Sequence, residues 1–544
     1  MFPLRGQVTS FTMTQIHAPA TPYELRPTPC YTFRMIPNFR SLYRASEEQT
    51  RFARIAFTAL LAFGFLGTVF FSSSLVVAVV LVIVVIALTF VRPEWTLIAF
   101  AAYLPFEPFF LKWIADDVYV FARYGSEMIV YLLVAVVFWR FATGAIQFRR
   151  TPIDVAFAVV VFLALASVVI NTVSPWIAVL GLRQIFRFVL LFFVVVYLAP
   201  SKSTMRAVVS TMIVIVGIQS CLGIAQAVFG EPIDVFLLPS AQRTLGDLQL
   251  TAGTTQFWDP GARVFGTLGR YDQLGTFMAF FLILLVAGFY EKIVKKAREL
   301  PALVLLVLGV IVLGLTYSRS AWFGFLFAFL FIAIVMKRDT RVLAVTVAVP
   351  ILLLGYLSFS GLVVKRIVDS ADQTFAERVF EVFSYARFSG EYYGLGRVYW
   401  IVQTVVTVVP HAPLFGFGPG SYGGGAVAAL GNTEVYDQLG LPFGVYGTEG
   451  YIDNNWFSMW GELGTLGLGA YIVMYLTLFG ACMRVYRESK DPEVRALALG
   501  VAGAMIAVSI NAFLATYLEA RTLAPYLWML SGAVIAFGKE EKIV

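Results

Sequence analysis

Three adjacent polar side chains stand at the entrance of an apolar segment in the last quarter of the sequence. The stretch GTEGYIDNNWFSMWGELG places Asp453, Asn454 and Asn455 directly before a hydrophobic run, and Glu462 inside it. A carboxylate in hydrocarbon costs roughly 2.5–3.5 kcal/mol, so acidic residues at such positions indicate a functional site. A partly buried carboxylate can also accept a hydroxyl proton. We therefore treat Asp453 as a candidate functional residue.

These residues also allow other roles. Glu449, which precedes Asp453 by four residues, is a rival base that the sequence does not separate from it. Asp453 and Asn454 are good N-cap residues, because Asp and Asn satisfy free amide donors at the start of a helix, and this role is compatible with catalysis. Glu462 lies nine residues past Asp453, about 13 Å along a helix. We expect Glu462 to be too deep for direct chemistry and to pair with an arginine across the helix bundle.

Arginines stand beside several apolar segments, where the head group of a membrane-borne anion would emerge. Arginine is always charged and forks bidentately onto phosphate or carboxylate oxygens. Arg319 stands out, because TYSRSAW places it in a tight turn between two apolar runs. A single arginine can instead anchor a helix end at the membrane interface, and this alternative stays open for Arg187 and Arg270. The candidate anion-binding residues are Arg183, Arg187, Arg263, Arg270, Arg319 and Arg397.

Long apolar runs must position these side chains. The chain has 544 residues, of which 59% are hydrophobic and only 13% charged, too few polar residues for a soluble protein of this size. Runs of about 20 apolar residues, the length that crosses about 30 Å of hydrocarbon, recur along the chain. We predict an all-α, polytopic transmembrane helical bundle of about 12–14 spans. The candidate spans are 52–70, 75–91, 95–111, 126–142, 153–170, 185–199, 207–228, 271–290, 300–317, 320–336, 343–360, 455–483, 496–515 and 523–538.

Basic residues orient the predicted spans, because Lys and Arg concentrate in alternate short loops, which the positive-inside rule places in the cytoplasm. Both termini are then cytoplasmic. Span 95–111 contains Pro105 and Pro108 and could be re-entrant. The predicted domains are a partly disordered cytoplasmic tail at 1–51, spans 1–11 within 52–360 with an outer loop at 229–270, a large outer loop at 361–454, spans 12–14 within 455–538, and a cytoplasmic tail at 539–544. The large loop holds an amphipathic helix, Arg397 to Val409, followed by the glycine-rich PLFGFGPGSYGGG.

Several kinds of chemistry are not expected. Three cysteines that lie far apart predict neither a disulfide framework nor a zinc site. With only two histidines, a multi-histidine metal site is not expected either. Neither side of the predicted membrane carries a Walker-type nucleotide-binding loop, so we expect no ATP hydrolysis. We predict no metal, no cofactor and no nucleic-acid partner, and the lipid bilayer as the surroundings of the chain.

Four segments, in order, resemble the O-antigen ligase and O-antigen polymerase superfamily, which are membrane glycosyltransferases of the GT-C type. They are RVFGTLGRYDQLGTF at 263–277, YSRSAWFG at 317–324, RVYWIVQTVVTVVPHAPLFGFGPGSYGGG at 397–425, and DNNWFSMWGELGTLGLG at 453–469. Each segment alone is short, but all four fall outside the membrane or at its outer interface in the predicted topology. The number of predicted helices also suits the family over the whole chain.

The resemblance implies a substrate and a reaction. The substrate is a glycan on undecaprenyl diphosphate, already on the periplasmic face of the bacterial inner membrane. The glycan moves to an acceptor and the lipid diphosphate leaves, without a nucleotide or a metal. Fixed cationic donors would stabilise the departing diphosphate. We assign this role to the six arginines above, with Arg319 and Arg263 as first choices.

The resemblance also gives roles to the residues around Asp453. Many members of the family, ligases especially, carry His-Asn where this chain has Asp453-Asn454, so Asp453 takes the place of a histidine near the acceptor hydroxyl. Asn454 and Asn455 would hydrogen-bond sugar hydroxyls. Trp400, three residues after Arg397, could stack on a sugar ring, although we favour packing.

Three functions follow, in order of preference. The missing histidine favours a polymerase that transfers a glycan to the non-reducing end of another lipid-linked repeat unit, of an O-antigen or an exopolysaccharide. A ligase that transfers the glycan to lipid A-core is second. A membrane transporter is third, and it should show broken helices and charges near the membrane midplane. A chain-length regulator and a flippase of the same pathway would be partners. The sequence leaves open the sugars, the linkage and the oligomeric state.

Overall fold

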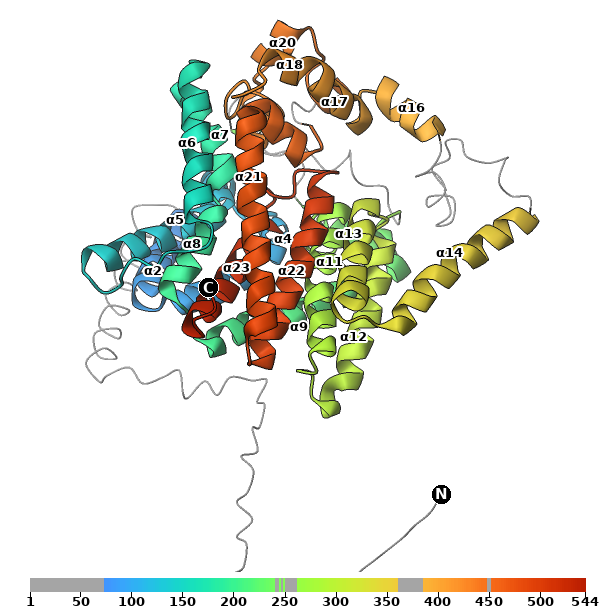
Figure 1. The fold of residues 1–544 in the computed structure, drawn as a ribbon. Helices are drawn as coiled ribbons and strands as arrows, with labels where there is room; N and C mark the ends of the chain where they lie inside the picture. Colours follow the sequence, from blue (N-terminus) through green and yellow to red (C-terminus); the bar gives the residue numbers. More distant parts are fainter. Residues whose placement is uncertain (1–72, 240–243, 246–247, 250–261, 361–384, 448–451) are drawn as a thin grey trace, which may run out of the picture. The chain divides into compact units, whose positions relative to one another are not determined.

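Helices account for nearly all regular structure in the computed structural model, which describes residues 73–239, 244–245, 248–249, 262–360, 385–447 and 452–544 (Figure 1). Strands in this part of the chain are limited to β1 (Thr244–Leu245) and β2 (Leu248–Gln249), a short antiparallel pair. The all-α prediction is therefore confirmed. The predicted tail at 1–51, the predicted span 52–70 and the rival base Glu449 lie outside the described residues, as does most of 240–261 and all of 361–384.

Each predicted span that falls on described residues corresponds to one or more helices. The first group is α2 (Ser73–Val91), α3 (Pro93–Tyr103), η1 (Leu104–Phe106), α4 (Glu107–Leu111), α5 (Asp116–Ala142), α6 (Asp154–Ile170), α7 (Pro175–Phe186), α8 (Val189–Leu198), α9 (Lys202–Phe229), α10 (Glu231–Leu237) and α11 (Tyr271–Tyr290). The second group is α12 (Lys296–Leu315), α13 (Arg319–Leu330), η2 (Phe331–Met336), α14 (Thr340–Ser360), α16 (Tyr385–Tyr393), α17 (Arg397–Gln403), η3 (Thr404–Val408), α18 (Val409–His411), α19 (Gly425–Leu430), α20 (Glu434–Leu439), η4 (Val445–Gly447), α21 (Asn455–Glu488), α22 (Pro492–Ala512) and α23 (Ala524–Glu540).

Many of these helices are long and apolar enough to cross a membrane. Among the described residues seven meet this length and composition, namely α5, α9, α11, α12, α13 with η2, α21 and α22. The pair α7 and α8, bent by 56°, counts as an eighth if it is one broken span. The predicted number was about 12–14. The other predicted spans fall on α2, α6, α14 and α23 and on the interrupted segment 95–111, and span 52–70 lies outside the described residues. The protein is a polytopic helical membrane protein.

The core of the bundle forms where α22 packs against α11, α13 and α21 (Figure 1). In α11 every side chain from Leu274 to Gly288 is buried, which explains why this helix is apolar on all sides. Two glycines let α22 approach α11 closely, because a Cβ at Gly500 or Gly503 would lie within 3.0 Å of an α11 side chain. Small residues at such contacts are typical of helices that pack inside membranes.

Helix α21 is broken at Gly464, where φ is +66° and ψ is −174°. The chain segment 413–418, which holds the first part of the glycine-rich stretch, fills this break. Amides of the segment donate to helix carbonyls freed by the break, and helix amides freed by it donate to the segment. The four bonds are Phe417 N to Gly461 O (2.9 Å), Gly418 N to Glu462 O (2.9 Å), Thr465 N to Pro413 O (2.9 Å) and Leu466 N to Leu414 O (3.2 Å). Backbone groups at such a break need partners of this kind.

The segment between Arg397 and Gly447 has its own small aromatic core. The chain is helical from Arg397 to His411 through α17, η3 and α18, as predicted for the amphipathic helix. Trp400 and Tyr422 are buried in this core, and the Thr404 hydroxyl lies 2.8 Å from the Tyr422 hydroxyl. These contacts hold α17 against the glycine-rich stretch, and they fix the position of Arg397 at the start of α17.

Candidate functional site

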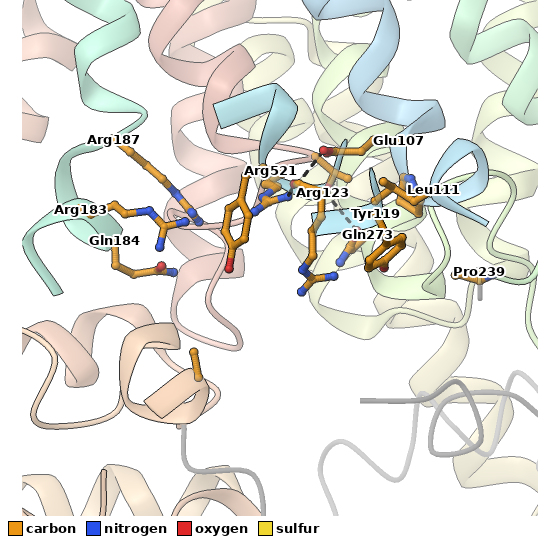
Figure 2. A pocket seen from close by; sticks show the side chains of 14 residues that line it. Glu107, Leu111, Tyr119, Arg123, Arg183, Gln184, Arg187, Pro239, Gln273 and Arg521 are labelled. Carbon is orange, nitrogen blue, oxygen red and sulfur yellow. Dashed lines mark hydrogen bonds and ion pairs between the residues drawn. The ribbon is translucent and has the colours of Figure 1, made fainter. Parts of the chain in front are cut away.

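A cavity of about 400 Å³ is lined by side chains of α4, α5 and α7 and of the α22–α23 loop, residues 513–523. We call it the arginine pocket, because Arg123, Arg183, Arg187 and Arg521 line it. Figure 2 shows Arg183, Gln184 and Arg187 on one side of the pocket and Arg123 on the other. The structure thus brings together two predicted anion-binding residues, Arg183 and Arg187, with two arginines that were not singled out.

Glu127 of α5 holds two of these arginines in place. Its carboxylate, 2% exposed, accepts a bidentate contact from Arg183. Arg187 Nη1 lies 3.1 Å from Glu127 Oε2, and Arg187 Nη2 donates to the backbone carbonyl of Glu519 at 2.9 Å. Because Arg187 is only 6% exposed and faces the pocket, it does not act as a simple anchor at the membrane interface.

The other two arginines are less fully compensated. Arg521 Nη1 lies 3.5 Å from Glu107 Oε1, and its Nη2 lies 3.9 Å from Glu127 Oε2. Arg123 makes no side-chain ion pair with the residues that the structure describes. Four guanidinium groups therefore face Glu107 and Glu127, and a third carboxylate, Glu519, also acts on Arg187. The net positive charge and the several N–H donors suit a phosphate-containing anion.

Acidic residues near the pocket do not form a metal site in the described part of the chain. There, no three Asp, Glu, His or Cys side chains gather closely enough to hold a metal ion. Glu107 and Glu127 are instead engaged by Arg521 and Arg183. The capacity of the pocket to bind an anion therefore comes from its arginines.

A second polar site surrounds Asp453, and we call it the Asp453 site. Arg397 Nη2 and Nε lie 2.8 and 3.2 Å from Asp453 Oδ2. Burial disfavours the charged guanidinium, but the Asp453 carboxylate outweighs this effect and raises the pKa of Arg397. Both contacts use Oδ2, and Oδ1 accepts no hydrogen bond from the described residues. The site therefore presents a fixed carboxylate with one oxygen available to a substrate.

Tyr517 of the α22–α23 loop lies near two further predicted residues, Arg270 and Arg319, at the Asp453 site. Its hydroxyl donates to Asp272 Oδ2 at 3.2 Å, and burial raises the pKa of Tyr517 well above its usual value, so the hydroxyl keeps its proton. Asp272 also receives Arg270 Nε and Nη2, at 3.1 and 3.3 Å. Ser320, the neighbour of Arg319 at the start of α13, acts on Tyr517 as well and lowers its pKa. The first turns of α11 and α13 thus meet beside the Arg397–Asp453 pair.

Two further predicted residues have other surroundings. Arg263 stacks over the ring of Tyr271, with 4.2 Å between its guanidinium carbon and the ring centroid. Trp400 is 1% exposed and packs edge-on against Tyr422 and Tyr436. The packing role favoured for Trp400 is confirmed, because its indole has no free face for a sugar ring.

The side-chain amides of Asn454 and Asn455 form hydrogen bonds within the protein. Asn454 caps α21, since its Oδ1 accepts the Phe457 amide at 3.1 Å, which confirms the predicted N-cap. Its Nδ2 donates to Phe513 O at 2.7 Å. Asn455 is fully buried, and its Nδ2 donates to Glu519 Oε1 at 3.2 Å. A role for either residue in sugar binding stays a prediction.

The expectation that Glu462 pairs with an arginine across the bundle is wrong, because it pairs with no arginine among the described residues. Its side chain is 3% exposed and faces the glycine-rich stretch, where a Cβ at Gly424 would lie 2.9 Å from Glu462 Oε1. Its Oε1 is buried and accepts no hydrogen bond from the residues that the structure describes.

The α22–α23 loop joins the arginine pocket to the Asp453 site. Arg521 of this loop lines the pocket, and Tyr517 belongs to the Asp453 site. Thr522 Oγ1 lies 3.4 Å from Gln273 Oε1, and Gln273 lines the pocket directly after Asp272 in the chain. A substrate held by the arginines would therefore lie next to the Asp453 site.

Sequence analysis missed Arg123, Arg521 and Glu127 as site residues. Arg123 and Arg521 lie at the ends of predicted spans, the same signal that singled out Arg183 and Arg187. Glu127 is a carboxylate within an apolar run, the signal used for Glu462. Its contact with Arg183 spans 56 residues of sequence, so no local spacing rule could reveal it.

In a comparison with known proteins, a family matches the part of the chain that holds Arg397 and Asp453. Residues 303–472, less than a third of the chain, match the family described as O-antigen ligase. The match contains Arg319, Arg397 and Asp453 but none of the four arginines of the pocket. No curated protein matches the chain. As the motifs predicted, the chain carries an O-antigen ligase domain at residues 303–472.

Proposed function

We propose that this protein is a polysaccharide polymerase, which transfers a glycan from undecaprenyl diphosphate to the non-reducing end of another lipid-linked repeat unit. The O-antigen ligase domain at 303–472 supports a function of the O-antigen ligase or polymerase type on a lipid-linked glycan. The observation that carries the proposal is that the α22–α23 loop joins the arginine pocket to a site where Arg397 holds a carboxylate. Together these features supply a donor site and a base for a hydroxyl acceptor.

The arginine pocket is the proposed site of the donor diphosphate. Its four guanidinium groups outnumber the carboxylates that act on them, those of Glu107, Glu127 and Glu519, so an entering diphosphate would neutralise the excess positive charge. Glu127 and Glu107 hold Arg183 and Arg521 in place before the substrate arrives. Fixed donors of this kind stabilise negative charge that develops on a leaving group. Arg123, which has no ion pair among the described residues, would be the donor most free to turn toward the diphosphate.

Asp453 is the proposed general base. Its Oδ1 would accept the proton of the acceptor hydroxyl while the hydroxyl oxygen attacks the anomeric carbon of the donor sugar. The bond between the anomeric carbon and the phosphate oxygen breaks, and its electron pair leaves with the lipid diphosphate. Arg397 keeps the carboxylate in position through Oδ2. The step balances without a nucleotide or a metal.

We infer that both sites face the periplasm in a bacterial inner membrane, with both chain ends in the cytoplasm. The distribution of Lys and Arg among the loops supports this orientation. A flippase would deliver the lipid-linked glycan to this face, and a chain-length regulator would act on the product there.

A ligase is the second candidate, because the matched family is itself described as O-antigen ligase. A deletion strain separates the two functions through the lipid-linked glycan that it accumulates. A single unpolymerised repeat supports the polymerase, whereas long unattached chains support the ligase. Transport is less well supported. Helix α21 is broken, but the backbone of 413–418 fills the break, and charged side chains line the arginine pocket and form the Asp453 site.

Purified protein supplied with lipid-linked repeat units tests the mechanism. It should lengthen them in the presence of a metal chelator and without added nucleotide. A strict requirement for a metal ion or for a nucleotide would rule out the mechanism. Arg123→Ala should raise the donor KM by about 10-fold or more, since a hydrogen bond to a charged group contributes about 1.5–3 kcal/mol. Arg149→Ala, at an exposed arginine outside both sites, is the matched control. Equal donor KM values for the two variants would remove Arg123 from the donor site.

A further inference from the structure

The Glu519 carboxylate accepts hydrogen bonds from three segments that lie far apart in the sequence. Its Oε2 accepts Gln184 Nε2 at 2.6 Å and the Gly425 amide at 3.3 Å. Its Oε1 accepts Asn455 Nδ2 at 3.2 Å. The side chain is 8% exposed, so these amide donors replace almost all of its contact with water. Burial raises the pKa of Glu519, and the amide donors oppose that rise.

Each of the three donors belongs to a part of the site already described. Gln184 lies between Arg183 and Arg187 in the chain and lines the arginine pocket itself. Asn455 follows Asp453 by two residues and begins α21. Gly425 ends the glycine-rich stretch that packs against α21. The two carboxylate oxygens therefore face different sites, Oε2 toward the arginine pocket and Oε1 toward the residues that follow Asp453.

We propose that Glu519 is a positioning residue that fixes the arginine pocket and the Asp453 site at the separation that glycan transfer needs. The role of Glu519 in glycan transfer rests on the proposed function. The contacts themselves, between Glu519 and Gln184, Gly425 and Asn455, are independent of it.

A carboxylate suits this place better than any other side chain. It offers two oxygens that only accept, whereas a glutamine offers one oxygen and an NH₂ group that donates. In Glu519→Gln the NH₂ group must face either the backbone amide of Gly425 or the side-chain amide of Asn455, and both are donors in the native contact. Two donors that face each other leave buried polar groups unsatisfied. One of the two sites would then shift relative to the other.

The shift should affect transfer more than binding. Arg187 contacts the backbone carbonyl of Glu519, so this contact with the pocket survives the change of side chain. A displacement of about 1 Å between reacting groups lowers the rate of transfer by about 100-fold. We therefore expect Glu519→Gln to lower kcat by about 10–100-fold. Affinity for farnesyl diphosphate, used as a short polyprenyl diphosphate probe, should remain within about threefold.

A swap of the two side chains provides a rescue. In Gln184→Glu/Glu519→Gln, the glutamine NH₂ donates to the new carboxylate at 184, and its oxygen still accepts Asn455 Nδ2. Two of the three native contacts are then restored, so kcat should recover at least in part. Glu434→Gln, at an exposed glutamate of α20, is the control and should match the wild type. A parallel loss of kcat and probe affinity in Glu519→Gln, or a swap variant no better than Glu519→Gln, would overturn the proposal.

Hydrogen exchange separates this inference from the proposed function. In Glu519→Gln the amide of Gly425, which donates to the carboxylate, should exchange faster. The amide of Leu518, which donates to Asn455 Oδ1 at 2.8 Å, should also exchange faster. Wild-type exchange at both amides would refute the coupling whatever reaction the protein catalyses. Faster exchange together with a wild-type protein that transfers no glycan would retain the coupling and reject only the proposed function.

Discussion

The break in α21 predicts a large effect of a very small change, Gly464→Ala. Gly464 has φ +66° and ψ −174°, a combination that only glycine adopts readily, and forcing alanine into it costs about 1–3 kcal/mol. The added Cβ would also lie 2.3 Å from Leu414 O and 2.5 Å from Gly416 N. Overpacking of this kind costs about 1–3 kcal/mol more. Because the obstructing atoms are backbone, they cannot rotate away.

Relief of the clash would break hydrogen bonds between the helix and segment 413–418. The two bonds at risk are Thr465 N to Pro413 O and Leu466 N to Leu414 O, and each contributes about 0.5–1.5 kcal/mol. The total destabilisation is therefore on the order of 4 kcal/mol. Gly469→Ala, in the same helix, is the matched control, because a Cβ there meets no atom within 4 Å. In a helix interior, alanine is favoured over glycine by about 0.5–1 kcal/mol.

The assay is the apparent thermal unfolding midpoint of both variants in the same detergent and at the same scan rate. Gly464→Ala should unfold well below the wild type, and Gly469→Ala at or slightly above it. Limited proteolysis of segment 413–418 should be faster in Gly464→Ala alone, since that segment would leave the helix break. Equal midpoints for the two variants would refute the interpretation that backbone contacts hold the segment in the break.

Three further predictions concern single side chains. Asp453→Asn should lower transfer by about 100-fold or more at equal expression, because an amide cannot take the acceptor proton; wild-type polymer yield would contradict this role. Arg319→Lys should fail to restore the activity lost in Arg319→Ala, because lysine cannot fork onto two oxygens; full recovery would mean that charge alone suffices. Burial alone would raise the pKa of Glu291, but Lys337 and Arg495 outweigh it and lower the pKa. The stability that this cluster contributes is therefore present above about pH 4.5 and lost as the pH falls through the lowered pKa. The unfolding midpoint of Glu291→Gln should accordingly fall less on acidification than that of the wild type, and parallel pH curves would contradict the assignment.

Local sequence signals predicted the helices and their ends. Apolar runs gave the position of each described span, and Pro105 and Pro108 marked the interruption that separates α3, η1 and α4. The N-cap preference of Asn predicted the start of α21 at Asn454. These features depend on neighbours within a few residues, which is why the sequence is sufficient to predict them.

Tertiary contacts set the limits of sequence prediction. Nothing in GELGTLGLG separates Gly464, at the helix break, from Gly469, in a regular turn of the same helix, because the difference is the arrival of segment 413–418. Likewise the Glu127–Arg183 pair joins α5 to α7. The sequence identified arginines at helix ends as candidate anion-binding residues. It did not predict which of them lie in the arginine pocket and which lie at the Asp453 site, because that depends on how the helices pack.

The α22–α23 loop gives the protein an order of maturation. Arg123, Arg183 and Arg187 are synthesised first, the O-antigen ligase domain next, and Tyr517, Glu519 and Arg521 only afterwards. Until that loop emerges from the ribosome, the pocket of the earlier arginines lacks Arg521, and Asp272 lacks its hydrogen bond from the Tyr517 hydroxyl. Translation of α22 and the residues that follow it therefore completes both the arginine pocket and the Asp453 site. Substitutions in this one short loop would therefore alter both sites while residues 303–472 stay unchanged.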